Sequence, residues 1–210
     1  MTRAAATRRG FLIAGTAGVL GLAGGAALQA ASSTDAVTGA AVDASPTEAD
    51  AGFCADMTLH HVQALTMCQR VLGRDTGDPV QAAAAEVLQN QAIQVGMMRA
   101  WLTDWGRSTA SPTTTMAWMG MNEGAGVPAL MMPGLATAKE LSSLSAATGA
   151  DQGRMWIELM RAHHVGGVAM AEAAVELVSA DKVRRLATIQ VQVQNFEIGQ
   201  YDVLLATVYA

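Results

Sequence analysis

All four histidines of this chain lie in two copies of one short pattern, Met-x-x-His-His-x5-Met. The two copies consist of Met57, His60, His61 and Met67, and of Met160, His163, His164 and Met170. Thioether sulfur together with imidazole nitrogen suits copper, and Cu(I) in particular, better than it suits magnesium or calcium. The pattern therefore predicts that these eight residues bind copper, as Cu(I), Cu(II) or both. Thioether donors also favour Cu(I) over Zn(II).

Each copy occupies one face of a predicted helix. At 100° per residue, the histidines and their flanking methionines span an arc of roughly 120°. The sequence leaves open whether the two arcs face each other in one site or form two. Asp56 and Glu158 are nearby carboxylates that could orient a ligating imidazole. Because an imidazole must be neutral to ligate, and its unperturbed pKa is about 6.5, histidine ligation predicts a loss of copper affinity between roughly pH 7 and 5.

The alternative is that these side chains only fill the core. A lone histidine on an apolar helix face is more often a hydrogen-bonded core residue than a ligand. Methionine, of which the chain has 13, is a flexible filler of helix cores. Here, however, the histidines form adjacent pairs with methionine before and after each pair, and few polar partners lie nearby to satisfy four buried imidazoles. These observations favour metal ligation.

The two copies lie 103 residues apart, and the same offset pairs further residues. The pairs are Gln91 with Gln194, Gln94 with Glu197, Val95 with Ile198, and Leu102 with Leu205. This register predicts a duplicated two-helix unit. Two helical hairpins with short internal loops indicate an all-α fold, an antiparallel four-helix bundle.

Capping signals set the predicted helix boundaries. Residues 45–48 combine an N-cap serine, a first-turn proline and a capping-box glutamate, which predicts a helix start at Ser45. A second capping box lies at Thr137 and Glu140. The predicted helices run from 45 to about 73, from 78 to about 105, from 137 to about 147, from about 151 to 177, and from about 179 almost to the C-terminus.

A long connection, residues 107–136, joins the two predicted hairpins. It is rich in Gly, Pro and Met, and contains Met116, Trp118, Met119, Met121, Met131 and Met132. The segment is either a hydrophobic flap on the bundle or a sulfur-rich segment that acquires metal. Because Met116, Met119 and Met121 have no helical stripe to join, we expect them to form a mobile capture segment outside the folded core.

The two cysteines, Cys54 and Cys68, lie 14 residues apart in the first predicted helix. At 1.5 Å per residue they are separated by about 21 Å, which is beyond the reach of a disulfide. They are predicted to be buried, inert thiols. The alternative is a soft ligand or an intermolecular bridge beside the first His-His pair.

Residues 1–31 are predicted to be an export signal. The twin arginine Arg8-Arg9 precedes an uncharged apolar stretch, residues 11–31, as in twin-arginine leaders. The stretch lacks a clean Ala-x-Ala cleavage site, so a membrane anchor is the alternative. A flexible linker is predicted over 32–46 and the bundle domain over 47–210. The domain is expected in the periplasm, outside the cell, or anchored to the outer face of the cytoplasmic membrane.

Several motifs spread along the chain resemble one known family. They are Asp50-x-x-Phe53-x-x-x-Met57-x-x-His60-His61, Gln91-x-x-Gln94-Val95-x-x-Met98-x-x-Trp101-Leu102, Met132-Pro133-Gly134-Leu135, Met160-x-x-His163-His164 with Met170-Ala171, and Gln194-x-x-Glu197-Ile198. From about residue 50 to 205 the chain resembles the bacterial proteins known as domain of unknown function 305. The resemblance implies a ferritin-like fold and export, and some members are associated with copper binding and tolerance. The family pattern has an acidic residue at Gln94 and Asp at Gly153, and lacks Cys54 and Cys68.

Taken together, the sequence predicts a non-enzymatic protein that sequesters copper or passes it to another copper-handling protein outside the cytoplasm. The alternative is a structural or interaction bundle without metal. A ferritin-like di-metal enzyme would need Glu-x-x-His pairs, and the chain has none. With a net charge of -5, nucleic acid is not an expected partner, because binding it requires basic surface.

Overall fold

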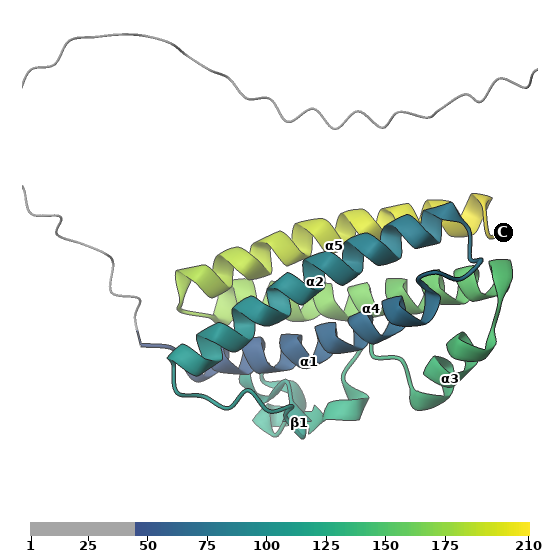
Figure 1. Cartoon of the computed structure of the whole chain (residues 1–210). Helices are drawn as coiled ribbons and strands as arrows, with labels where there is room; N and C mark the ends of the chain where they lie inside the picture. The colour runs from purple at the N-terminus through teal and green to yellow at the C-terminus, as the bar shows by residue number, and fades with distance from the viewer. Residues whose placement is uncertain (1–44) are drawn as a thin grey trace, which may run out of the picture. The chain divides into compact units, whose positions relative to one another are not determined.

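The computed structural model describes residues 45–210, which form five α-helices and one long connection (Figure 1). The helices are α1 (Glu48–Val71), α2 (Asp78–Asp104), α3 (Ala138–Ala146), α4 (Gly149–Leu177) and α5 (Asp181–Thr207). The predicted leader, residues 1–31, and most of the predicted linker, residues 32–46, lie outside the described residues. Between residues 45 and 210, no helix is both long enough and apolar enough to span a bilayer.

Four of the helices form the predicted bundle. α2 packs along α1 and α5 packs along α4, so both predicted hairpins are present. α1 and α4 also pack closely against each other, whereas α2 and α5 meet through side chains such as Gln94 and Gln190. The short helix α3 packs on α1 and α4 from outside (Figure 1). The interface between α1 and α4 is therefore the centre of the molecule, and it carries both His-His pairs.

The first helix begins two residues later than predicted. Its N-cap is Thr47, whose hydroxyl accepts the backbone N–H of Asp50 (3.2 Å), while the Asp50 carboxylate accepts the Thr47 N–H (2.7 Å). The prediction of a capping box between Ser45 and Glu48 is wrong, because Thr47 and Asp50 form the box instead. The Asp50 carboxylate also accepts the backbone N–H groups of residues 179 and 180 (3.1 and 2.8 Å) and so joins the start of α1 to the α4–α5 turn.

The other helix starts agree more closely with the sequence. α2 begins at Asp78, but its N-cap is Gly77, whose φ of 92° favours glycine. Asp78 therefore supplies an acidic residue to the first turn and not a side-chain cap. The capping box of Thr137 and Glu140 opens α3 as predicted.

The buried core consists of two apolar clusters with the histidines between them. Along α1, the buried members of the first cluster end at Met57, and those of the second begin at Ala64. Along α4, Met160 belongs to the second cluster and Met170 to the first. The duplicated sequence thus places one methionine from each copy at each end of the histidine layer.

The connection between α2 and α3 is a packed flap. It contains the strands β1 (Thr114–Thr115) and β2 (Val127–Pro128), which pair antiparallel, and 3-10 turns over Ala117–Met119, Met121–Gly124 and Ala129–Met131. Met116 is only 3% exposed and belongs to the first core cluster, against which Met119 and Met121 pack. The prediction of a mobile capture segment outside the core is therefore wrong. Met132 is also buried, and only Met131, at 71%, is largely exposed.

The flap is held by Asp56 of α1. The carboxylate of this buried residue accepts the backbone N–H of Met116 (2.6 Å) and the indole N–H of Trp118 (2.9 Å). The Trp118 ring also meets Phe53 edge to face, with centroids 5.8 Å apart. A polar anchor 60 residues away in the sequence, together with aromatic packing, explains why these methionines lie in the core.

Candidate metal centre

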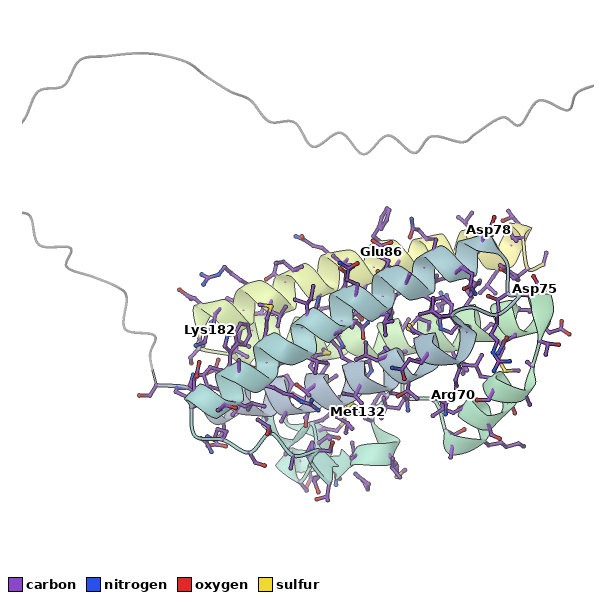
Figure 2. The ribbon with its side chains drawn as sticks, viewed as in Figure 1. Arg70, Asp75, Asp78, Glu86, Met132 and Lys182 are labelled. Atoms are coloured by element: carbon purple, nitrogen blue, oxygen red, sulfur yellow. The ribbon has the colours of Figure 1, made fainter. Side chains whose placement is uncertain are left out.

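The two His-His pairs meet in the middle of the bundle. His60 and His61 come from α1, His163 and His164 come from α4, and all four are fully buried. The rings of His60 and His163 are stacked, with centroids 3.7 Å apart and planes inclined by 31°. Figure 2 shows these helices with their side chains filling the space between them. The two arcs, whose relation the sequence left open, therefore face each other.

Hydrogen bonds orient three of the imidazoles. His61 Nε2 lies 2.8 Å from Gln94 Oε1, and His164 Nε2 lies 2.6 Å from a carboxylate oxygen of Glu197. His163 Nε2 lies 2.8 Å from the backbone oxygen of His60. For His163 the partner is a backbone oxygen, so its Nε2 carries the proton and its Nδ1 keeps a lone pair that can bind a metal. The His61 Nε2 atom lies between an acceptor, Gln94 Oε1, and a donor, the Gln190 amide nitrogen (3.3 Å).

Five buried nitrogen atoms of this centre have no hydrogen-bond partner. They are Nδ1 of His60, His61, His163 and His164, and Nε2 of His60. Buried polar atoms without partners are uncommon and destabilising in folded proteins. Unpaired basic nitrogen is the group that a soft or borderline cation would satisfy. The donor set thus fits the copper that the sequence predicts.

The four predicted methionine ligands flank the histidines on both sides. Met57 and Met170 lie in one core cluster, and Met67 and Met160 in the other, all fully buried. Among residues 45–210, no three His, Cys, Asp or Glu side chains are gathered so that they could hold a metal ion.

Burial keeps His60, His61 and His163 neutral. It lowers the pKa of His61 to about 4 against the opposing hydrogen bond with Gln94, and the neighbouring His164 ring adds a smaller lowering. Burial also holds the pKa of His60 and His163 well below 6.5, and their neighbouring imidazoles act in the same direction. These groups are already neutral at pH 5. The predicted loss of copper affinity between pH 7 and 5 therefore does not follow once burial is considered.

The carboxylates that the sequence put forward do not orient the imidazoles. Asp56 holds the flap, and the Glu158 side chain is 49% exposed and pairs with Arg154. Gln94 and Glu197 are the residues that contact the imidazoles, and the sequence did not predict this role for them. A signal was present, because each lies 33 residues after the histidine it contacts and the two are related by the 103-residue offset.

The structure gives a reason for one departure from the family pattern. A Cβ at Gly153 would lie 2.6 Å from the Thr76 carbonyl oxygen and 2.7 Å from Tyr209 Cε1. The Tyr209 hydroxyl in turn donates to the Thr76 carbonyl. Glycine at 153 therefore lets the C-terminal tyrosine close the α1–α2 turn, and aspartate would not fit there.

The cysteines are free and buried. Both lie on α1, as predicted, and burial raises the pKa of Cys54 and of Cys68 to about 12. Because the thiolate is the form that binds metal, neither is poised to ligate at neutral pH. This agrees with the prediction of inert thiols.

Asp56→Ala is expected to lower the free energy of unfolding by about 2 kcal/mol, because it leaves two buried N–H groups without an acceptor. Glu158→Ala is the matched control: it removes an exposed carboxylate and should change stability by no more than about 0.5 kcal/mol. Urea unfolding of both variants measures the difference. Equal, small effects would show that Asp56 does not hold the flap.

Comparison with known proteins identifies a sequence family and a shared fold. The family described as "Domain of unknown function (DUF305)" matches residues 50–205. A DUF305 protein from Streptomyces coelicolor, provisionally described as secreted, is 39% identical over 75% of this chain and 92% of its own, with a TM-score of 0.69. A DUF305 fragment from Deinococcus radiodurans is 28% identical over 78% and 99%, with a TM-score of 0.64. A search of curated proteins returned no match.

A third similar structure contains a bound metal. CopM in its Cu(I)-bound form is 23% identical over 77% of this chain and 98% of its own, with a TM-score of 0.59. CopM is also known in Cu(II)-bound and Ag-bound forms. At this level of identity the likeness establishes the helical fold that the two proteins share.

Proposed function

This chain belongs to the DUF305 family, and from that premise we propose that it binds copper outside the cytoplasm and sequesters it or passes it to another copper-handling protein. The binding residues are the two His-His pairs, with the flanking methionines Met57, Met67, Met160 and Met170. The protein acts as a binder and not as an enzyme. Export by the twin-arginine leader is part of the proposal, and the similarity to a protein described as secreted supports it.

One observation carries the proposal: four stacked or adjacent imidazoles are buried with every Nδ1 unpaired and with methionine at both ends. A bundle that served only as a scaffold would gain stability from apolar residues at these positions. The copper-bound and silver-bound forms of CopM, a protein of the same fold, support a soft metal as the cargo.

The small number of nitrogen and oxygen donors favours Cu(I) over Zn(II). Structural zinc takes four ligands from Cys, His, Asp and Glu. Within residues 45–210 no three such side chains are placed to hold an ion, whereas four buried methionines flank the histidines, and thioether sulfur is a ligand that Cu(I) accepts. A di-metal oxidase is the weaker alternative, because the chain has none of the Glu-x-x-His pairs from which such a site is built.

Metal competition tests the proposal. The purified protein, stripped with a chelator and reloaded, is expected to hold Cu(I) at least about 100-fold more tightly than Zn(II), a difference of about 2.7 kcal/mol. Titration against a Cu(I) chelator with absorbance readout, followed by elemental analysis, measures both affinities. Tighter binding of zinc would contradict the copper assignment, and no retained metal of either kind would favour the scaffold alternative.

A further inference from the structure

The buried histidines are closed off on one side by backbone. On the flap side, Pro133 and Gly134 lie directly on α4 at Gly166. A Cβ at Gly166 would collide with the Pro133 carbonyl, and one at Gly134 would lie 3.0 Å from the carbonyl oxygens of Ala162 and His163. Such contact between two backbones leaves no room for an ion or water. Met132, labelled in Figure 2, is buried next to this contact.

The opposite side is covered by α2 and α5, whose side chains Gln190 and Gln94 hydrogen-bond across the seam between them (2.8 Å). The seam contains a narrow cavity of about 10 Å³, room for about one water molecule. Its polar lining residues are Asn90, Gln91, Gln94, Gln190, Gln194 and Glu197. Two of these, Gln94 and Glu197, are the hydrogen-bond partners of His61 and His164, so the seam borders the centre.

The lining of the seam is unusually polar for the interior of a bundle. Gln91, Gln190 and Gln194 are at most 4% exposed, and the side-chain oxygen of each lacks a hydrogen-bond partner. The amide nitrogen of Gln190 donates to Gln94 Oε1 (2.8 Å) and lies 3.3 Å from His61 Nε2. Unpaired amide oxygens destabilise a dry core, and water entering the seam would satisfy them.

Gln194 brings this lining directly to the histidines. Its Oε1 atom and the His60 Cε1 atom both border Gly167, where a Cβ would collide with the first and lie 3.3 Å from the second. The absence of a side chain at position 167 is what allows the amide and the imidazole to share this space. Gln91 occupies the corresponding place in the first half of the duplicated sequence.

From this geometry we infer that the α2–α5 seam is the route by which copper enters and leaves the histidine centre. The amides of Gln91 and Gln194 line the route, and Asn90 and Val193 form its mouth. Both mouth residues are exposed, Val193 at 37%, and they are related by the 103-residue offset. The inference rests on the proposed function, because it describes how the buried site is reached.

Closing the mouth tests the route. The double variant Asn90→Trp, Val193→Trp, in the full chain, is expected to take up Cu(I) at least about ten-fold more slowly and to release it to a chelator more slowly by the same factor. Copper stoichiometry and melting temperature should be unchanged. The matched control is Gln89→Trp, Gln192→Trp, which adds the same bulk at exposed neighbouring positions outside the seam. Stopped-flow measurement with the Cu(I) chelator complex gives the rates.

A metal-free measurement separates this inference from the proposed function. Solvent exchange of the buried imidazole N–H protons, followed by NMR, should slow in the plugged variant Asn90→Trp, Val193→Trp and stay at the wild-type rate in the control. Suppose that the wild-type protein binds copper at full stoichiometry and that the plugged variant has the same uptake and exchange rates. The route would then be wrong, while the proposed function would stand. Slowing of the same size in the control would also overturn the route. A wild-type protein that binds no Cu(I) at equilibrium would overturn the proposed function, and with it the route for copper.

Discussion

Replacing His60 and His61 together with alanine is expected to remove almost all copper binding, including that of His163 and His164. His163 stacks on His60 at 3.7 Å and donates its Nε2 proton to the His60 backbone oxygen, so the two pairs form one centre. The affinity for Cu(I) should fall at least about 100-fold, or about 2.7 kcal/mol. Copper stoichiometry after desalting, with circular dichroism to confirm folding, measures the effect.

Two further variants separate ligation from packing. His60→Phe keeps a ring against His163 but removes both nitrogen atoms, and should lose copper as the alanine variant does. Tyr201→Phe keeps the ring beside His164, at 5.5 Å, and removes only a hydroxyl that has no hydrogen-bond partner, so copper binding should be unchanged. If the His60 and His61 double variant retained half of the wild-type copper, the two pairs would be independent sites.

Acid is expected to destabilise the metal-free protein strongly between pH 6.5 and 4. In the unfolded chain the imidazoles titrate near 6.5, whereas burial lowers the pKa of folded His61 to about 4. The unfolded state therefore binds more protons in this interval, and stability is complete above pH 6.5 and is lost as the pH falls toward 4. For His61 alone the difference corresponds to about 3 kcal/mol. His60 and His163 shift in the same direction.

Asp56 acts in the opposite direction. Burial raises its pKa to about 6, against hydrogen bonds from Met116 and Trp118, so the folded state binds the extra proton between about pH 6 and 3.8. The stabilisation by Asp56 in acid is about as large as the destabilisation by one histidine. Acid therefore still lowers the free energy of unfolding. Urea unfolding of stripped protein at pH 7.5, 6, 5 and 4.5 measures the slope, and Asp56→Ala should make it steeper. A stability that is level from pH 7.5 to 5 would contradict the burial of neutral imidazoles.

The parts of the fold that were predicted correctly depend on local signals. Helical periodicity and the capping box at Thr137 act within a few residues, and the 103-residue offset identified the two hairpins. The flap was predicted wrongly for the opposite reason. Whether Met116 is buried depends on the Asp56 carboxylate, 60 residues earlier, and on aromatic contact with Phe53, neither of which leaves a periodic pattern in the connection itself.

The sequence alone determined the candidate ligand types and their spacing on two helices, and hence the soft metal that we propose. Only the tertiary structure decided that His60 and His163 stack and bring the two pairs together, that Gln94 and Glu197 contact His61 and His164, and that an amide-lined seam borders them. The reason is physical: spacing along a helix sets which face a side chain occupies. The position of that face depends on how the helices pack, and the absence of a side chain at Gly167 lets His60 of α1 and Gln194 of α5 both approach α4.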